Sequence, residues 1–513
     1  MALFSENERV RLRAIQHLSY CNPFLPERIA FERTILGKKF IETGEAWHKR
    51  ADEVADRPNI DRLTECAREF GNQARERLNR GTRADDDELS LYVDVVLYYL
   101  YNKYQFRFFE HVRRGHAGAS PDAPEQSFSF YSEFQEDLIH YLGMPGIPFS
   151  HEESDHLFSG FFQIRRAFHH IYDNIIGGSM VSAKLRAAVW QSIFTVDMRR
   201  YRRVLYKRMG DITTLISGPS GTGKELVARA IGLSRYIPFN RQKRRFAMNF
   251  AAGFFPVNLS ALSRTLIESE LFGHAKGSFT GAVKDRTGLF ELCPEWGAVF
   301  LDEIGELDPG VQVKLLRVLQ MRTFQRIGDL SVRRFDGKAM AATNRNLERE
   351  LREGRFREDL YYRLCSDIIV TPSLREQLAG SPEQLHNLLL FIARRVAGEE
   401  EAEVLTREVE RWIHENLGDD YAWPGNVREL EQCVRNYMIR HEYRPPAIHH
   451  GQPLEELAES LRTGQLSAQE LLEHYCTITY ARTSSYTETA RLLGLDRRTV
   501  RARVKADLLE RYR

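Results

Sequence analysis

The sequence lacks several features that would assign the chain to a specialised class. It has only six cysteines in 513 residues and no C-x-x-C pair, so we expect neither a disulfide framework nor a cysteine zinc site. No run approaches about 18 uninterrupted apolar residues, and the start of the chain has no signal-type apolar core, so we expect a cytoplasmic protein without a membrane span. The net charge is only +2, so any nucleic-acid binding must depend on local basic patches.

The composition is that of a folded, multidomain chain. Hydrophobic residues make up 42% and charged residues 28% of the sequence, and the length suits about two to four domains. Short apolar runs alternate with helical patterns over 175–372, which predicts a buried parallel sheet. The other segments are a helical, aromatic-rich region over 1–174, a helical region over 373–443, a Pro/His/Gly-rich linker over 444–459 and a small helical module over 460–513. The expected fold class is a mainly helical N-terminal domain, an α/β core and an all-α C-terminal domain.

A glycine-rich loop lies between a predicted strand and a predicted helix. The segment GPSGTGKE follows the apolar run TTLIS and precedes ELVARAIG, which is the context that a P-loop requires. Glycines let backbone N–H groups approach phosphate oxygens, and Lys224 would reach the β- and γ-phosphates. Glu225 stands where the general motif has Ser or Thr. The predicted nucleotide-binding residues are Gly218, Pro219, Ser220, Gly221, Thr222, Gly223, Lys224 and Glu225.

Polar side chains end two later apolar runs. In GAVFLDEIGEL, Asp302 is suited to hold Mg²⁺ through its water shell, and Glu303 to orient and polarise the attacking water. The run KAMAATN ends in Asn344, which could contact the γ-phosphate or the water, although an ordinary strand-end turn is the alternative. The sequence therefore predicts a site that binds ATP and Mg²⁺ and hydrolyses ATP.

These motifs resemble one known family. GPSGTGKE, ESELFGHAKGSFTGA, GAVFLDEIGEL, FREDLYYRL and WPGNVRELE occur in an order similar to that of the central domain of sigma-54-dependent activators, the NtrC-like enhancer-binding proteins. The resemblance runs from about 175 to 443. It implies an AAA+ P-loop ATPase with a helical lid, usually a hexamer, that remodels the closed complex of sigma-54 RNA polymerase to the open complex. That family's P-loop commonly ends in Gly-Lys-Glu, which accounts for Glu225, whereas Pro219 replaces its usual Glu.

The sharpest motif is GSFTGA, which resembles the GAFTGA loop that touches sigma-54 in that family. Its flanking glycines allow movement, and we expect Phe279 and Thr280 at the apex, since an exposed aromatic ring usually marks a contact surface. A hairpin turn with the ring tucked inward is the alternative, and Ser278 replaces the usual Ala. The predicted sigma-54 contacts are Gly277, Ser278, Phe279, Thr280, Gly281 and Ala282.

The resemblance implies further roles by position. Asn258 aligns with the asparagine that restrains the catalytic glutamate and couples it to the loop. Arg357 and Arg363 look like the arginine fingers supplied to a neighbouring subunit's nucleotide. Arg428 resembles the lid arginine that senses bound phosphates, and Ile176 is assigned to the nucleotide site.

A basic, aromatic segment over 234–253 is longer than the family's usual connection at this point. Its cations are Arg241, Lys243, Arg244 and Arg245. They could meet nucleic acid or an acidic partner, but a solvated loop is the more common explanation.

The C-terminal module reads as two short helices around Gly494. Residues 482–513 contain nine Lys or Arg against four Asp or Glu. The pattern resembles the Fis-type helix-turn-helix that ends many sigma-54 activators, whose second helix enters the major groove, generally as part of a dimer. A basic amphipathic hairpin is the alternative. The predicted DNA-binding residues are Arg497, Arg498, Thr499, Arg501, Arg503 and Lys505.

The N-terminal region resembles no family and lacks the pattern of a phospho-receiver. Residues 92–109 include eight aromatics; they could line a ligand pocket or a dimer interface, but a core helix is the more usual explanation. The histidines and acids over 151–170 have no diagnostic metal-ligand spacing. We predict a helical regulatory domain for an unknown signal.

Three functions fit the sequence. The first is an ATPase that activates sigma-54 promoters from an upstream DNA site. The second is a DNA-binding AAA+ regulator without sigma-54 coupling, and the third is an AAA+ remodeller of another protein. The GSFTGA motif and the acid pair favour the first.

Overall fold

The computed structural model describes residues 3–42, 58–117, 127–144, 146–379, 383–445, 453–462, 464, 466–505, 508–509 and 512. The chain divides into two compact units, Met1–Met438 and Ile439–Arg513. Among the helices in these residues, none has the length and apolar character to cross a membrane.

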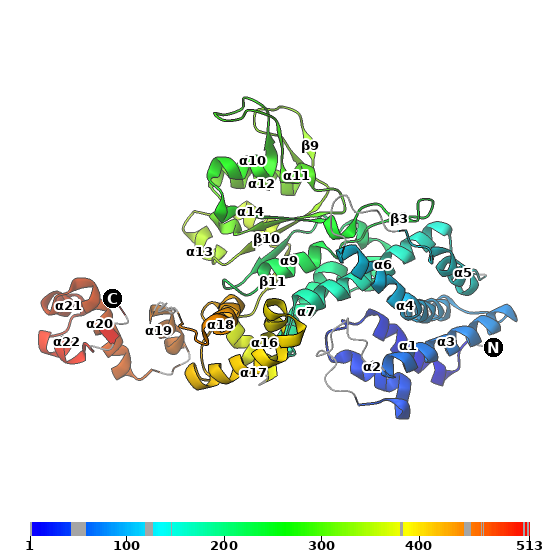
Figure 1. Ribbon diagram of the computed structural model, residues 1–513, viewed down its shortest axis with the longest axis horizontal. Helices are drawn as coiled ribbons and strands as arrows, with labels where there is room; N and C mark the ends of the chain where they lie inside the picture. The colour runs from blue at the N-terminus through cyan, green and yellow to red at the C-terminus, as the bar shows by residue number, and fades with distance from the viewer. Residues whose placement is uncertain are drawn as a thin grey trace. The chain divides into compact units, whose positions relative to one another are not determined.

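The N-terminal region is helical, as predicted (Figure 1). Ser5 caps the first helix through a reciprocal pair of hydrogen bonds with Glu8. The aromatic segment 92–109 lies inside one long helix whose Tyr92, Tyr104 and Phe108 are at most 1% exposed, which confirms that it is a core helix. The helices are α1 (Glu6–Tyr20), α2 (Glu27–Leu36), α3 (Pro58–Asn79), α4 (Asp86–Ala117), α5 (Tyr131–Leu142) and α6 (His151–Asn174).

The centre of the chain is an α/β core around a five-stranded sheet, whose neighbouring strands all run parallel. All six residues of its central strand β10 are buried, as expected of a parallel sheet covered on both faces. The strand order is β11-β1-β10-β7-β4. The bounds are β1 (Thr214–Ser217), β4 (Phe254–Asn258), β7 (Ala298–Asp302), β10 (Lys338–Thr343) and β11 (Asp367–Val370).

Helices cover both faces of this sheet and bury alternate strand residues. One face, which includes Leu301 and Ala341, packs on α10 (Arg264–Phe272), α12 (Pro309–Met321) and α14 (Glu358–Leu364). The other, which includes Phe300 and Met340, packs on α7 (Met180–Phe194), α9 (Lys224–Gly232) and the end of α6. Helix α6 therefore belongs both to the N-terminal helices and to the wall of the sheet.

The segment over 234–253 joins the N-terminal core. It forms a hairpin of β2 (Phe239–Asn240) and β3 (Arg245–Phe246). Phe239, Phe246 and Phe250 belong to the same hydrophobic core as the helices α1 to α6. The four basic residues lie on the exposed or half-exposed side of this hairpin, so its aromatic residues, which the sequence did not assign to any core, carry the packing.

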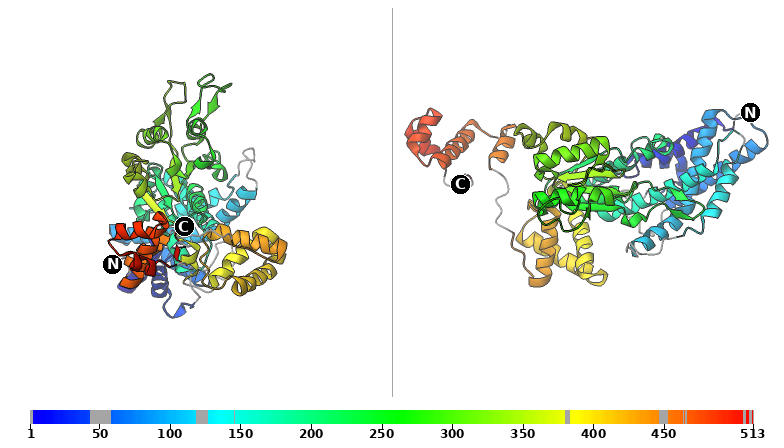
Figure 2. Two further views of the ribbon diagram at one scale, coloured as in Figure 1. Left: turned by 90° about the vertical axis from the view of Figure 1, so that its left-hand side faces the viewer. Right: turned by 90° about the horizontal axis from the view of Figure 1, so that it is seen from above.

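The remaining helices form the lid and the C-terminal unit. The lid consists of α15 (Leu374–Leu378), α16 (Glu383–Ala397), α17 (Glu399–Asn416) and α18 (Asn426–Arg440), and its last three helices gather in a group of their own beside the sheet (Figure 2). The C-terminal unit contains α19 (Pro453–Arg462), α20 (Ala468–Thr483), α21 (Tyr486–Leu493) and α22 (Arg497–Arg503).

Candidate nucleotide-hydrolysing site

Side chains of the predicted site lie at the carboxyl ends of neighbouring strands. Asn258 at the end of β4 is in register with Asp302 at the end of β7, and Ser217 at the end of β1 is in register with Thr343 of β10. The glycine loop follows Ser217 directly. Because all these ends meet at one edge, the sheet brings the loop and the acids together where open α/β sheets bind ligands.

The glycine loop needs its glycines for two reasons. Gly218, Gly221 and Gly223 have φ values of 146°, 77° and 85°, which L side chains rarely adopt. A Cβ on Gly218 would lie 2.2 Å from the hydroxyl of Thr371, and one on Gly221 would lie 2.3 Å from the carbonyl oxygen of Gly425. The loop can therefore hold this shape, with helix α9 starting immediately after it, only with glycine at these positions.

Lys224 is held inside the loop at the first turn of α9. Its side chain is 8% exposed, and Nζ donates to the carbonyl oxygens of Gly218 at 3.0 Å and Pro219 at 3.1 Å. Burial lowers the pKa of Lys224, and the carboxylates of Glu303 and Asp302 oppose that shift. The lysine and the acid pair are thus near enough to interact electrostatically.

The acid pair adopts an unusual backbone turn. Glu303 has φ 56°, which is uncommon for a residue other than glycine and frequent at functional sites. Its backbone N–H donates to Asp302 Oδ1 at 3.0 Å, and its carboxylate accepts from the backbone N–H of Asn344 at 3.3 Å. Burial, followed by the charge of Glu303, raises the pKa of Asp302. A bound cation would relieve both causes, so these residues suit Mg²⁺ together with a nucleotide phosphate chain.

Asn258 makes a different contact from the one that the resemblance implies. Its side-chain oxygen accepts from the N–H of Ser260 at 3.0 Å and from the hydroxyl of Ser260 at 2.7 Å. In this conformation the carboxylate of Glu303 is held by the backbone of Asn344 instead. The residue that follows β10 therefore holds the carboxylate of Glu303, through a backbone N–H group that no sequence motif specifies.

The first turn of the lid helix α18 closes against the glycine loop. The side-chain nitrogen of Asn426 donates to the carbonyl oxygen of Ser220 at 2.9 Å. The backbone N–H of Val427 donates to the carbonyl oxygen of Gly221 at 3.1 Å. Arg428 donates to the hydroxyl of Ser220 at 3.3 Å, which brings the predicted lid arginine to the loop. Asn426 was not singled out from the sequence, although it lies within the motif WPGNVRELE.

A second lid contact lies next to Ile176, which is half-buried. Gln384 of α16 accepts from the backbone N–H of Gly178 at 2.6 Å and of Ser179 at 3.1 Å. Gln384 is itself fully buried. This glutamine fixes the segment before α7 to the lid, and no sequence pattern pointed to it because its partners are backbone groups 205 and 206 positions away.

In the single chain the two predicted arginine fingers contact residues of α14 and α12. Arg357 is exposed and forms a 2.7 Å ion pair with Asp359. Arg363 donates to the carbonyl oxygen of Leu319 at 3.0 Å. Arg355 pairs with Glu350 and Glu353, so it is part of a surface ion-pair group.

The GSFTGA motif lies between the strands of a hairpin, β5 (Gly273–His274) and β6 (Arg286–Thr287). The hairpin is joined to a second one, β8 (Thr323–Phe324) and β9 (Arg333–Arg334), because the N–H of Ala275 donates to the carbonyl oxygen of Ile327 at 2.9 Å. Both project from the sheet at the top of Figure 1. Gly277 and Gly281 have φ values of 82° and 99°.

The apex of this hairpin differs from the expectation for Phe279. That ring is half-buried against His274, with centroids 4.9 Å apart, whereas Thr280 is exposed. The most exposed apolar side chains in these hairpins are Val283 at 79% and Leu330 at 89%. The two hairpins therefore expose the Thr280 hydroxyl together with the aliphatic side chains of Val283 and Leu330. Neither Val283 nor Leu330 was singled out from the sequence.

In the C-terminal unit, Gly494 ends α21 with a φ of 65°, so α22 can follow after a short turn. Asp496 is the N-cap of α22. Arg497, Arg498 and Arg501 are exposed on α22. The other predicted DNA-binding residues have internal contacts: Thr499 donates to Asp496, and Arg503 and Lys505 pair with Glu473 of α20 at 3.1 Å and 3.7 Å.

The geometry defines a class of protein. A parallel sheet with a glycine-rich phosphate loop, an acid pair at the adjoining strand end and a helical lid form a P-loop ATPase core of the AAA+ type. The family model described as the Sigma-54 interaction domain matches residues 195–369. This central part of the chain is therefore similar to the sigma-54 interaction domain.

Curated relatives agree over the same part of the chain. The Nif-specific regulatory protein of Azotobacter vinelandii is 46% identical over 230 residues, which are 45% of this chain and 40% of that protein. The signal-transduction and transcriptional-control protein of Clostridium beijerinckii is 40% identical over 276 residues, 54% of this chain and 38% of that protein. The matches thus span about two fifths of the length of these relatives.

Solved structures were compared as well. NtrX from Brucella abortus in complex with ATP is 24% identical, with a match that covers 70% of this chain and 76% of that chain at a TM-score of 0.38. The similarity to the sigma-54 interaction domain rests on the sequence matches alone.

Proposed function

We propose that the protein hydrolyses ATP to remodel the closed complex of sigma-54 RNA polymerase into the open complex, acting from an upstream DNA site. The observation that carries this proposal is the carboxylate of Glu303, which is fixed by Asn344 at the same strand edge as Lys224, inside a sigma-54 interaction domain. Such a fixed carboxylate near a phosphate loop suits the orientation of an attacking water.

The hydrolytic roles follow from the positions of the side chains. Lys224 and the backbone N–H groups at the start of α9 neutralise the β- and γ-phosphates. Asp302 would hold Mg²⁺, which supplies charge neutralisation between the phosphates when it is bound. Glu303 orients the water and takes up its proton. Arg428, already on the loop through Ser220, reports phosphate occupancy to the lid.

Assembly into a ring of subunits would complete the nucleotide-hydrolysing site. Arg357 lies on the surface, and among the residues that the structure describes its side chain forms an ion pair only with Asp359 in the same turn. An exposed ion pair of this kind is weak. Its guanidinium is therefore available to a neighbouring subunit's nucleotide, where it would stabilise transition-state charge. We propose a hexameric ring, as in the related family, with Arg363 as the second such arginine.

The paired hairpins serve as the contact for sigma-54. The exposed Thr280 and the glycines that flank it lie at the end of a hairpin whose base contacts α10, and the second hairpin follows α12. A nucleotide-driven shift of these helices would move both hairpins together because they are hydrogen-bonded to each other.

Recognition of the upstream site is assigned to α22. Its exposed Arg497, Arg498 and Arg501 suit phosphate and base contacts in a major groove. Arg503 and Lys505 hold α22 on α20 through Glu473, so we assign them a mainly structural part.

The test is transcription in vitro with sigma-54 polymerase, a supercoiled sigma-54 promoter and ATP. Wild type should form open complexes; Glu303→Gln and Thr280→Ala should each form at least about tenfold fewer, a loss typical of removing a catalytic contact. Thr280→Ala should retain ATP hydrolysis and thus separates coupling from chemistry. The proposal is wrong if wild type forms no open complexes, or if either variant is as active as wild type.

A further inference from the structure

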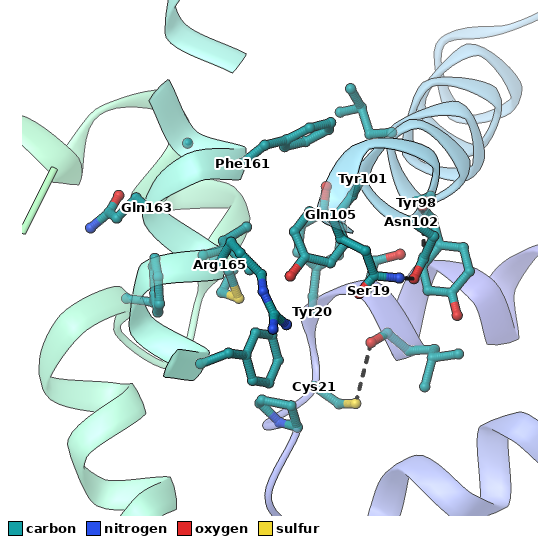
Figure 3. Close-up of a pocket in the computed structure, with 18 of the residues that line it drawn as sticks. Ser19, Tyr20, Cys21, Tyr98, Tyr101, Asn102, Gln105, Phe161, Gln163 and Arg165 are labelled. Carbon is teal, nitrogen blue, oxygen red and sulfur yellow. Dashed lines mark hydrogen bonds between the residues drawn. The ribbon is translucent and has the colours of Figure 1, made fainter. Parts of the chain in front are cut away.

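A cavity of about 280 Å³ lies among α1, α4, α6 and α7, away from the nucleotide loop (Figure 3). Aromatic side chains form much of its lining. These rings line the cavity. They come from the N-terminal helices, from α7 and from the segments that follow α7 and α9. They are Tyr20, Tyr98, Tyr101, Phe161, Phe168, Tyr172, Trp190, Phe194, Tyr201 and Tyr236.

The charges around the cavity favour an anion. Three arginines, Arg28, Arg165 and Arg202, line it against two carboxylates, Glu32 and Asp94. Glu32 is matched by Arg28 at 2.7 Å, and Asp94 is paired with Arg199 from outside the lining. Both carboxylates therefore have arginine partners within the protein, and among the described residues of the lining arginines outnumber carboxylates by three to two.

Arg165 brings that positive charge into the aromatic region. Its side chain is 4% exposed and lies over the ring of Phe109 at 4.2 Å. In Figure 3 it extends from α6 into the space between the labelled residues. A buried guanidinium beside aromatic rings suits a planar ligand with a carboxylate, which the guanidinium can bind in a bidentate manner.

We propose that this cavity binds a small aromatic acid, a planar molecule of about two rings with one carboxylate. The size follows from the volume, since an apolar cavity of about 150 Å³ accepts benzene. The rings of the ligand would stack on the tyrosines and phenylalanines, and the carboxylate would face Arg165.

The same helix connects the cavity to the ATPase core. Gln163 of α6, which lines the cavity, donates to the carbonyl oxygen of Ser234 at 2.9 Å. Arg166 donates to the carbonyl oxygen of Leu233 at 2.9 Å and to that of Arg235 at 2.6 Å. These carbonyls follow α9 directly, whose other end holds Lys224. A ligand against α6 would therefore alter ATP hydrolysis, and this regulatory step rests on the proposed function.

Gly160 offers a way to fill the cavity without disturbing the fold. It lies within α6 and lines the cavity, and a Cβ at this position would meet no atom within 4 Å. Gly160→Leu should therefore place its side chain in the open space. Gly160→Ala adds a single methyl group at the same site and is the matched control.

The test is calorimetric titration of the full chain, without nucleotide, with sodium 2-naphthoate and with the neutral analogue 2-naphthylmethanol. We expect 2-naphthoate to bind at one site with a dissociation constant below about 1 mM, and at least about tenfold more tightly than the alcohol. Gly160→Leu should weaken binding by at least about tenfold because the space is filled, while Gly160→Ala should bind like wild type.

Three results would overturn the assignment: no binding of 2-naphthoate, equal binding by Gly160→Leu, or equal affinity for the neutral alcohol. The regulatory step is measured separately as ATP hydrolysis, which should change at least about twofold on addition of 2-naphthoate in wild type and stay constant in Gly160→Leu. Binding without such a change overturns the coupling alone, and absent hydrolysis without ligand overturns the proposed function instead.

Discussion

Phe162 of α6 and Phe246 of β3 stack with their ring centroids 4.5 Å apart and their planes inclined by 22°. The first residue belongs to the N-terminal helices, and the second lies between the phosphate loop and β4. Phe239 and Phe250 flank Phe246 in the same core. The ATPase segment thus supplies part of the hydrophobic core of the N-terminal region, and the two regions are packed as one body within Met1–Met438.

Removal of the N-terminal helices should therefore damage the ATPase core. A chain restricted to residues 175–443 would expose Phe239, Phe246 and Phe250, and each loses about 1.5–3 kcal/mol of burial free energy. We expect it to aggregate and to bind a hydrophobic dye, as measured by light scattering and dye fluorescence. The same shortened chain with all three phenylalanines changed to Ser is the control; it should aggregate less, because only the sheet face that α6 covers remains exposed. Equal dispersity of the two shortened chains would contradict the packing argument.

Lys224→Ala and Glu303→Gln should separate nucleotide binding from hydrolysis. The first removes the buried cation of the phosphate loop, so ATP affinity measured by titration should fall by at least about 2 kcal/mol, the scale of a charged hydrogen bond. The second keeps the shape of the side chain but removes the base, so it should bind ATP normally and hydrolyse it at least about 100-fold more slowly. Upstream DNA binding in a gel shift should persist in both. Loss of DNA binding in Lys224→Ala would indicate that the C-terminal unit depends on the ring.

Ser278→Ala should stabilise the GSFTGA hairpin slightly. The hydroxyl oxygen of Ser278 is buried and has no hydrogen-bond partner within the described part of the chain. Its removal should raise the free energy of unfolding by about 1 kcal/mol, because an unsatisfied buried polar group is costly. Thermal unfolding checks this. Gly328→Ala is the opposing control: its φ is +75° and its new Cβ would lie 2.5 Å from Cβ of Ser278, so it should unfold at a lower temperature than wild type.

Lys338 should make stability depend on pH. It is 2% exposed, donates to the carbonyl oxygen of Ile212 at 2.8 Å, and burial lowers its pKa from 10.5 to about 7. Between these values the unfolded chain binds a proton that the folded chain does not. The free energy of unfolding should therefore rise with pH above about 7, by up to about 1.4 kcal/mol per pH unit.

Urea unfolding of wild type and Lys338→Met across that range checks the sign. The variant carries no titrating group at this position, so it should lack this part of the pH slope. Identical slopes for the two proteins would show that Lys338 stays protonated in the folded state.

The phosphate loop and the acid pair could be read from the sequence because each is a short continuous segment whose chemistry depends on residue type and spacing. The parallel sheet was likewise predictable, since its strands are uniformly apolar runs followed by polar residues. The position of Arg428 followed from the family motif. The contact of Glu303 with Asn344 did not, because a backbone N–H group can hold a carboxylate whatever the sequence of that turn.

Sequence alone thus determined the class of chemistry: a phosphate cradle, a pair of acids, a glycine-flanked loop and two C-terminal helices around Gly494. Only the tertiary structure decided which distant segments share a surface. Gln384 meets Gly178 across 206 positions, and Phe246 completes the core around Phe162. Some aromatic residues of α4 and α6 pack in that core, whereas others, such as Tyr98 and Phe168, line a cavity. Such contacts depend on how whole helices pack. The order of apolar and polar residues along the sequence shows which residues will be buried, but it does not show which residues they will contact.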